Sequence, residues 1–445
     1  MARPRKSTRL SVTLNGRLVG VLDRAPNGAI SFAYAPEWLE DEHRAIPVSL
    51  SLPLREDRYT GAEVSAYFDN LLPDNDQIRR KVAEKVGAEG TDAFNLLSRI
   101  GRDCVGALQF LPDGAEVPPP GPPQFVPLDD AEIAQTIRDL ATAPLGIRAD
   151  GEREFRISIA GAQEKTAFLW NDGWCLPQGA TPTTHIFKPQ LGELPNGLDM
   201  TRSVENEHFC LTLCRELGLD AAESEILDFE DTRVLSIKRF DRMETEDGRL
   251  LRIPQEDFCQ ALSVPSTLKY NNEGGPGIEQ CLSLLKSSDY AEEDRLAFLK
   301  AQIVFWLIAA TDGHAKNFSI FIMRGGRFRM TPLYDVMSAQ PNYAQGKMRR
   351  KDFKLAMAVG NNRHYIVNEI MPRHFFQSAE AAGIQTDQVV VLLRDLEQNA
   401  AAAMERAIWA MPDDFPMVIY ESILEKAEVK LSGIRSALGT VNSFV

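Results

Sequence analysis

A proline-rich stretch near position 120 divides this chain. The six residues from Pro118 to Pro123 include five prolines. Consecutive prolines lack backbone donors and have a fixed φ, so they exclude a helix or a central strand and favour an extended, semi-rigid spacer. We therefore expect a domain boundary here, with an N-terminal α+β subdomain at 1–112 and a linker at 113–127.

The rest of the chain changes character once more. Strand-like segments recur between Phe155 and Phe240, with one helical stretch at about 203–217, and beyond Pro254 the pattern is mainly helical. This order predicts a β-rich lobe at 128–241 and a helical lobe at 242–445. The expected class is α+β, with a bilobal protein-kinase-like fold and an additional N-terminal subdomain.

Charge and cysteine content exclude some classes of protein. A formal net charge of −14 over 445 residues argues against a protein that coats nucleic acid with its whole surface. One local basic cluster remains of interest, because it could face an acidic peptide, a partner or DNA; it contains Lys347, Arg349, Arg350, Lys351 and Lys354. Six cysteines without framework spacing indicate free thiols in a reducing cytosol.

The apolar runs are short. The longest, Ile303 to Ala310, is far below the length of a membrane span. The chain opens on basic residues followed by a strand-like segment rather than the apolar core of a signal peptide. We expect a cytoplasmic protein with no membrane contact.

The residues richest in chemistry form one loop and the hairpin after it. Asp312 and Asn317 are five positions apart, and Asp335 follows two strand-like segments separated by Arg324 to Arg327. A kinase needs an aspartate that accepts the substrate's hydroxyl proton, an asparagine that binds Mg²⁺ on the same loop, and a second aspartate from the next hairpin. Each aspartate alone could equally be a helix cap; the spacing favours catalysis.

Two further segments have the position of nucleotide-binding elements. Residues 158–166 lie between strands and are rich in small residues that let backbone N–H groups approach phosphate, although a plain hairpin turn is an equal alternative. Lys188 ends a later strand, where the lysine that binds α- and β-phosphates belongs. Glu207 lies on the apolar face of the following helix and is the expected ion-pair partner of Lys188. Glu205 is the alternative partner.

Positions 237–240 lie between the expected lobes. In a bilobal kinase this segment is the hinge, whose backbone groups bind adenine. Within the catalytic loop, His314 and Lys316 could reach the transferring phosphate. Lys316 is the stronger candidate because it is a fixed positive charge where negative charge develops, whereas His314 could simply shape the loop.

Several blocks of sequence, in order, resemble the HipA family of serine/threonine kinases, the toxins of type II toxin-antitoxin modules. They are RISIAGAQEKT, HIFKP, ENE, KRFDR, TDGHAKN and YDV. The resemblance implies Asp312 as catalytic base, Asn317 and Asp335 on Mg²⁺, and Ser158 as the serine whose autophosphorylation silences the kinase. It also implies an ATP site that comprises Ala160, Gly161, Ala162, Gln163, Glu164, Lys165, Lys188, Lys238, Arg239, Phe240, His314, Lys316, Asn317 and Asp335.

The same resemblance implies partners. Members of the family are neutralised by a small helix-turn-helix antitoxin, HipB, and the assembly binds operator DNA. Their described substrates are aminoacyl-tRNA synthetases, chiefly glutamyl-tRNA synthetase. Two other functions stay open at this point: a small-molecule or lipid kinase of the same fold, and a catalytically silent co-repressor subunit. Lys238 departs from the family, where many relatives have glutamate.

Overall fold

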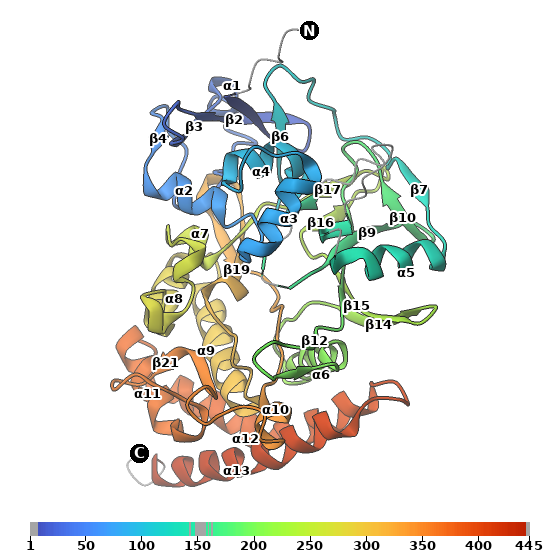
Figure 1. The fold of residues 1–445 in the computed structure, drawn as a ribbon. Helices are drawn as coiled ribbons and strands as arrows, with labels where there is room; N and C mark the ends of the chain where they lie inside the picture. The colour runs from blue at the N-terminus through green and yellow to red at the C-terminus, as the bar shows by residue number, and fades with distance from the viewer. Residues whose placement is uncertain (1–7, 142–143, 147–156, 159, 162, 442–445) are drawn as a thin grey trace. The chain divides into compact units, whose positions relative to one another are not determined.

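The computed structural model describes residues 8–141, 144–146, 157–158, 160–161 and 163–441 (Figure 1). Within it the chain forms two compact units. Unit 1 contains residues 1–189, 227–267 and 320–328, and unit 2 contains residues 190–226, 268–319 and 329–445. The N-terminal hundred residues and the strands of the small lobe therefore share one unit. Helices and strands are both well represented, as the α+β class predicts.

Unit 1 begins with an antiparallel sheet whose strand order is β4-β3-β2-β1-β6. Asn15 and Gly16, a dipeptide typical of hairpin turns, both have positive φ and connect the first two strands. The strands are β1 (Arg9–Leu14), β2 (Arg17–Arg24), β3 (Ile30–Tyr34), β4 (Tyr59–Thr60) and β6 (Leu108–Pro112). The helices with them are α1 (Pro36–Leu39), α2 (Ala62–Asp69), α3 (Asp76–Val86) and α4 (Ala93–Ile100).

A second sheet in unit 1 has the order β14-β15-β11-β9-β10-β7. Helix α5 (Asp130–Arg138) buries Ile133 and Ile137 in the same core as Phe168 and Phe187. The strands are β7 (Phe125–Pro127), β9 (Thr166–Trp170), β10 (Trp174–Pro177), β11 (His185–Pro189), β14 (Ser224–Phe229) and β15 (Thr232–Lys238). Shorter elements are β5 (Asp103–Cys104), β8 (Ile157–Ser158), β16 (Arg242–Glu244), β17 (Leu250–Arg252), β18 (Gln255–Asp257) and α7 (Phe258–Ala261).

The proline-rich stretch is more integrated than a free spacer. The last residues of the expected linker, Phe125–Pro127, form edge strand β7 against β10. A Cβ atom placed on Gly16 would lie 2.4 Å from Cδ of Pro120, so the prolines pack closely on the first hairpin turn. The expected linker at 113–127 therefore ends in a strand, which its proline content did not reveal.

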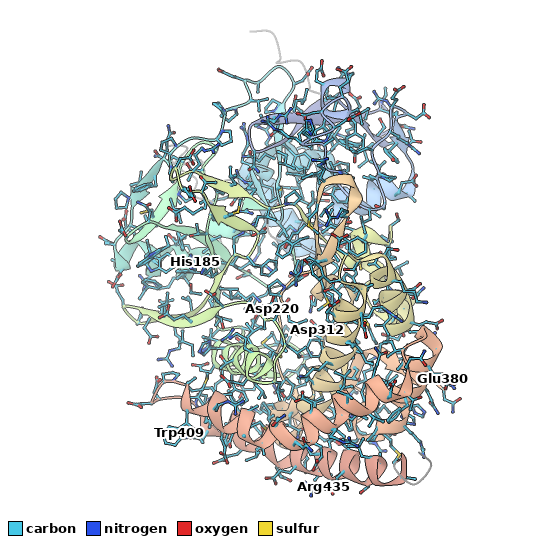
Figure 2. All side chains as sticks on the ribbon, turned by 180° about the vertical axis from the view of Figure 1, so that it is seen from behind. His185, Asp220, Asp312, Glu380, Trp409 and Arg435 are labelled. Atoms are coloured by element: carbon cyan, nitrogen blue, oxygen red, sulfur yellow. The ribbon has the colours of Figure 1, made fainter. Side chains whose placement is uncertain are left out.

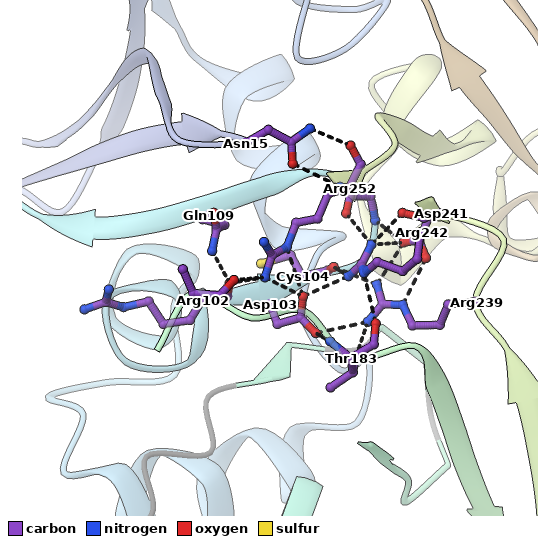
Figure 3. Close-up of polar contacts among 12 residues, drawn as sticks. Asn15, Arg102, Asp103, Cys104, Gln109, Thr183, Arg239, Asp241, Arg242 and Arg252 are labelled. Carbon is purple, nitrogen blue, oxygen red and sulfur yellow. Dashed lines mark hydrogen bonds and ion pairs between the residues drawn. The ribbon is translucent and has the colours of Figure 1, made fainter. Parts of the chain in front are cut away.

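A buried cluster of charges connects distant parts of unit 1 (Figure 3). Three guanidinium groups, from Arg239, Arg242 and Arg252, surround the carboxylates of Asp103 and Asp241 at 2.8–3.4 Å. Burial alone would raise the pKa of Asp103, but the three arginines hold that pKa below its usual value. Buried charges are tolerated only when they are paired. All three arginines pair with Asp103, so the cluster depends on this carboxylate.

Unit 2 is mainly helical. Its longest helices, α12 (Thr386–Trp409) and α13 (Met417–Val441), run side by side in Figure 1, and α9 (Ala291–Ile308) contacts both. The other helices are α6 (Ser203–Glu216), α8 (Ile278–Leu284), α10 (Gln340–Ala344) and α11 (Pro372–Ala382). The strands of this unit are β12 (Gly192–Glu193), β13 (Asp199–Met200), β21 (Lys354–Val359) and β22 (His364–Ile366). The expected hairpin, β19 (Ser319–Ile322) and β20 (Phe328–Met330), belongs mostly to unit 1, which contains residues 320–328.

The cysteines are free and buried, as expected: Cys104, Cys175, Cys210, Cys214, Cys259 and Cys281. Burial raises the pKa of the thiols of Cys104 and Cys214 to about 12, because a thiolate loses its hydration there. Within the residues that the structure describes, no helix is long and apolar enough to span a membrane.

We expect Asp103→Ala to destabilise the protein strongly. The change leaves three buried guanidiniums with one carboxylate, and breaking a buried ion pair costs about 3–5 kcal/mol. Chemical denaturation of the full chain measures the free energy of unfolding. Asp228→Ala is the control, because it removes the half-exposed partner of Arg233 and should change that free energy little. Equal effects of the two variants would contradict the role of the buried cluster.

Candidate active site

The catalytic loop begins where helix α9 stops. Ala309 caps the helix in the left-handed conformation, with φ 56°, and the N–H of Ala310 donates to the carbonyl of Phe305 at 2.8 Å. The last two turns of α9 are buried, so the point of departure is fixed. Asp312 follows at this end of the helix, far from Trp409 and Arg435 on the long C-terminal helices (Figure 2). Its side chain is 62% exposed, as a group that meets a substrate must be.

Hydrogen bonds inside the loop explain the five-residue spacing. Nδ2 of Asn317 donates to the backbone carbonyl of Asp312 at 2.8 Å, and the N–H of Asn317 donates to the carbonyl of His314 at 2.9 Å. The loop thus folds back on itself and fixes the amide of Asn317, which is buried. Because Nδ2 is used, Oδ1 is the end of this amide that suits a cation.

Gly313 is required by close packing. A Cβ atom at this position would lie 2.4 Å from Cδ2 of Phe305, whose ring is buried in α9. Real Cβ atoms do not approach a ring so closely, so any other residue would push the loop away from the helix. The glycine between Asp312 and His314 therefore sets the position of Asp312, the expected catalytic base.

The segment that carries Asp335 is tied to this loop on both sides. On one side, the hydroxyl of Tyr334 donates to the carbonyl of Lys316 at 2.7 Å and lies 2.6 Å from Oγ of Ser319. On the other, the N–H of Ala339 donates to the carbonyl of Ala309 at 2.9 Å. Asp335 itself has φ 59°, a conformation that aspartate tolerates better than most residues. The structure therefore brings together the two segments that the spacing singled out.

The donor set suits magnesium. Asp312, Asn317 and Asp335 offer oxygen atoms, and Mg²⁺ favours one or two carboxylates together with substrate phosphates. Within the described part of the chain, no cluster of three or more His, Cys, Asp or Glu residues forms a closed metal cage. An open oxygen site that is completed by a nucleotide fits these residues, and their binding of Mg²⁺ stays a prediction.

His314 and Tyr270 surround the catalytic aspartate. The hydroxyl of Tyr270 donates to Oδ1 of Asp312 at 2.6 Å, and the ring of His314 meets that of Tyr270 edge to face at 4.9 Å. His314 is buried and its Nε2 lies 4.0 Å from the same oxygen. Tyr270 lies 42 residues before Asp312, and no motif in the sequence points to it.

The expected phosphate loop lies in unit 1 and is held by residues far away in sequence. The N–H of Asp74 donates to the carbonyl of Gly161 at 3.0 Å, and Nε2 of Gln163 donates to the carbonyl of Pro189 at 3.1 Å. Gly161 has φ 113° and approaches Lys165 so closely that a Cβ would lie 2.7 Å from Nζ. The positive φ, which residues with a side chain rarely adopt, favours glycine at this position.

Two predictions in this loop fall outside the described structure. Ala162 lies outside the described residues, as does the side chain of Ser158, whose backbone pairs with Cys104 in parallel strands β5 and β8. Glu164 is described: burial raises the pKa of its carboxyl, and Lys81, 3.9 Å away, opposes this. Ala160 is half-buried at the start of the loop.

The lysine candidates are buried. Lys188 and Lys165 are each 6% exposed, so neither is a strand lysine that faces solvent. In α6 the expected inward stripe is present, but Glu205 and Glu207 are both buried, so burial does not choose between them. Nε2 of Gln190 donates to Glu205 at 2.7 Å. Lys188 belongs to unit 1 and the two glutamates to unit 2, and the ion pair stays a prediction.

The expected hinge has a structural role that its sequence concealed. The side chain of Arg239 is fully enclosed in the buried charge cluster, and its N–H donates to the carbonyl of Thr184 at 2.8 Å. Arg239 can therefore offer adenine only its carbonyl. Lys238 is exposed at the end of β15, and the ring of Phe240 packs edge to face on Phe321 at 5.7 Å.

We call residues 334–336 the metal segment, because Asp335 is a predicted Mg²⁺ ligand. The basic cluster that follows this segment is partly neutralised. Lys347 pairs with Asp199 at 2.7 Å, Arg349 with Asp352 at 2.6 Å, and Arg350 with Glu369 at 2.9 Å. These are surface pairs that salt screens readily. The cluster is therefore a mixed surface rather than a strong anion-binding patch.

Comparisons with known proteins identify the family. Residues 157–404 match the HipA-like C-terminal domain, and residues 10–111 match the HipA N-terminal domain. The chain is 36% identical to the Y4mE protein of Sinorhizobium fredii, over 90% of this chain and 91% of that protein. The name of that protein describes it as a kinase. It is 26% identical to the serine/threonine-protein kinase toxin HipA of Shewanella oneidensis, over 92% of this chain and 91% of that protein.

A solved structure supports the fold. The model resembles HipA in the Shewanella oneidensis complex of HipA, HipB and operator DNA, with a TM-score of 0.80 and 24% identity, over 97% of this chain and 99% of that chain. The predicted kinase-like fold with an additional N-terminal subdomain is thereby confirmed.

We expect Gly313→Ala to lower kcat about tenfold to a hundredfold in a phosphoryl-transfer assay. The new methyl group would displace the loop from Phe305, and a shift of about 1 Å at a reacting group costs roughly that much. Gly433→Ala is the control, because no atom lies within 4 Å of a Cβ there. A Gly313→Ala enzyme with wild-type kcat would show that the loop does not depend on this contact.

Tyr270→Phe should lower kcat several-fold and leave the KM for ATP unchanged. The variant keeps the ring that packs on His314 and removes only the donor to Asp312, a hydrogen bond worth about 1.5–3 kcal/mol when one partner is charged. Steady-state kinetics measure both constants, with Tyr420→Phe on α13 as the matched control. An altered KM for ATP with normal kcat would point instead to a nucleotide contact.

Proposed function

This chain belongs to the HipA family of serine/threonine kinases, and we propose that it is an ATP- and Mg²⁺-dependent protein kinase that acts as the toxin of a toxin-antitoxin module. The observation that supports this proposal is the set of hydrogen bonds between two segments of the site. Hydrogen bonds on both sides of Asp335 hold its segment against the loop of Asp312 and Asn317. A phosphoryl-transfer site consists of these groups in that arrangement.

In this mechanism the protein contributes position and charge. Asp312 accepts the proton of the substrate hydroxyl through the carboxylate that Tyr270 orients. Lys316, a cation in the buried part of the loop, counters negative charge on the transferring phosphate. Asn317 and Asp335 would hold Mg²⁺, which supplies charge neutralisation for the phosphates when it is bound. No covalent intermediate with the protein is needed.

We propose an ATP site made of the segments that the family resemblance singles out. The phosphate loop from Ala160 to Lys165 and Lys188 would bind phosphate groups, and backbone atoms of the segment 238–240 would bind adenine. Burial of Lys165 and Lys188 supports this assignment, because their side chains lie inside the protein rather than in bulk solvent. Glu207 or Glu205 would orient Lys188.

Regulation by phosphorylation of Ser158 is a further part of the proposal. The phosphoserine would add nearly two negative charges beside a loop that is suited to another phosphate. Because β8 pairs with β5 next to Cys104, its backbone adjoins the buried charge cluster. Phosphorylation would displace the phosphate loop and silence the kinase.

The proposed partners follow from the relatives. The Shewanella oneidensis structure contains HipA with HipB and operator DNA, and this chain is similar to that HipA along almost all of its length. We propose a helix-turn-helix antitoxin that neutralises this chain and joins it in repression at an operator. The proposed substrate is an aminoacyl-tRNA synthetase, with glutamyl-tRNA synthetase as the first to test.

Asp312→Asn should abolish phosphoryl transfer and toxicity together. Loss of a general base costs about 10²–10⁴-fold in rate, so radiolabel from Mg-ATP should no longer reach Ser158 or an added synthetase. Growth of cells that express the chain without its antitoxin is the second measurement. Asp413→Asn, an exposed residue before α13, is the matched control.

Three outcomes would refute the proposal in different ways. Labelling of a soluble metabolite with no protein labelled would indicate a small-molecule kinase. Unchanged toxicity of Asp312→Asn would indicate a co-repressor whose nucleotide site is silent. Absence of label from wild-type protein that binds ATP normally would exclude an active toxin kinase.

A further inference from the structure

Two asparagines in unit 2 each make two hydrogen bonds to the backbone of one residue, one from the amide nitrogen and one to the amide oxygen. Nδ2 of Asn206, on α6, donates to the carbonyl of Ser338 at 2.8 Å, and Oδ1 accepts from the N–H of Ser338 at 2.9 Å. Asn342 makes the same pair of bonds with the backbone of Asp199, at 2.9 Å each. Both asparagines are 5% exposed. We call these two reciprocal pairs the asparagine clasps.

The clasps join the start of α6 to the segment that follows Asp335. Asp199 lies just before α6 and Asn206 lies in its first turns, whereas Ser338 and Asn342 follow the metal segment. Ser338 also donates from Oγ to the carbonyl of Ile308, the last residue of α9, at 2.5 Å. Ser338 is therefore the point where α6, the metal segment and the helix before the catalytic loop meet.

We propose that Asn206 is a positioning residue that holds Asp335 for Mg²⁺ and makes the position of α6 depend on that of the metal segment. The inference rests on the proposed function and adds a means of regulation to it. Ser338 is only three residues from Asp335, and Asn206 fixes its N–H and its carbonyl at once. Movement of α6, which carries Glu205 and Glu207, would therefore draw Ser338 away from Ile308 and displace the carboxylate of Asp335.

A purely structural role makes a different prediction. A buried amide that loses its partners destabilises a protein by about 1–3 kcal/mol wherever it lies, with no effect on metal binding. The two clasps allow a comparison, because they have the same chemistry, the same burial and different distances along the chain from Asp335. If positioning is the role, the Asn206 clasp should affect Mg²⁺ dependence more strongly than the Asn342 clasp, which is four residues further on.

The test compares the Mg²⁺ dependence of the full-length wild type with that of Asn206→Asp and Asn342→Asp. Asn206→Asp keeps the acceptor and replaces the donor to Ser338 by a negative oxygen. We expect its half-saturating Mg²⁺ concentration to rise about tenfold and its kcat at low Mg²⁺ to fall, with recovery at high Mg²⁺. Asn342→Asp should shift the half-saturating concentration less than threefold. Lys347→Ala, which removes an exposed pair with Asp199, should shift it little.

Ser338→Ala covers the case in which Asn206→Asp does not fold. It removes the bond from Oγ to Ile308 and the bond that Oγ accepts from the N–H of Gln340, and it leaves the backbone clasp intact. We therefore expect a shift in the same direction of about two- to fivefold. A lowered melting temperature with wild-type Mg²⁺ dependence in both variants would overturn the proposal. So would equal shifts for Asn206→Asp and Asn342→Asp.

A binding measurement separates this inference from the proposed function. Calorimetric titration with a non-hydrolysable ATP analogue, with and without Mg²⁺, reports the metal-dependent part of nucleotide affinity without catalysis. Loss of that part in Asn206→Asp supports the coupling even if wild type transfers no phosphate to protein. Normal metal-dependent affinity in Asn206→Asp refutes the coupling even if wild type is an active kinase.

Discussion

The chemistry of this protein depends on hydrogen bonds that hold one extended segment against one loop. Asp312 and Asn317 come from the loop after α9, and Asp335 comes from the segment after β20. Tyr334 and Ala339, on either side of Asp335, bond to Lys316 and Ala309 on either side of the loop. Positioning contributes much of a kinase's rate, so these neutral contacts matter as much as the charged residues that they place.

The sequence predicted the elements and the main loop well, because their signals are local. The expected helix at about 203–217 is present as α6, and the two strand-like segments before Asp335 form a hairpin. The contacts that complete the site are not local. Tyr270 reaches Asp312 across 42 positions and Asn206 reaches Ser338 across 132. No pattern within a short window distinguishes such residues from ordinary polar ones.

The side chains of the expected hinge have a role that the motif alone does not indicate. The position of the block that begins at Lys238 predicts a hinge whose backbone groups bind adenine. Its arginines and aspartate instead form a buried cluster with Asp103 and Arg252, which joins the N-terminal sheet to the strands of the small lobe (Figure 3). The side chains of this block serve cohesion within unit 1, and any contact with nucleotide falls to its remaining backbone groups.

The enclosed cysteines have a practical consequence for spectroscopy. A maleimide or iodoacetamide probe reacts with an accessible thiolate, and the native sulfurs are neither accessible nor readily ionised. A single cysteine that is introduced at the exposed position of Arg202, directly before α6, would therefore accept a fluorophore or spin label selectively in the otherwise unaltered chain. Distances from that label would report the motion of the helix during turnover.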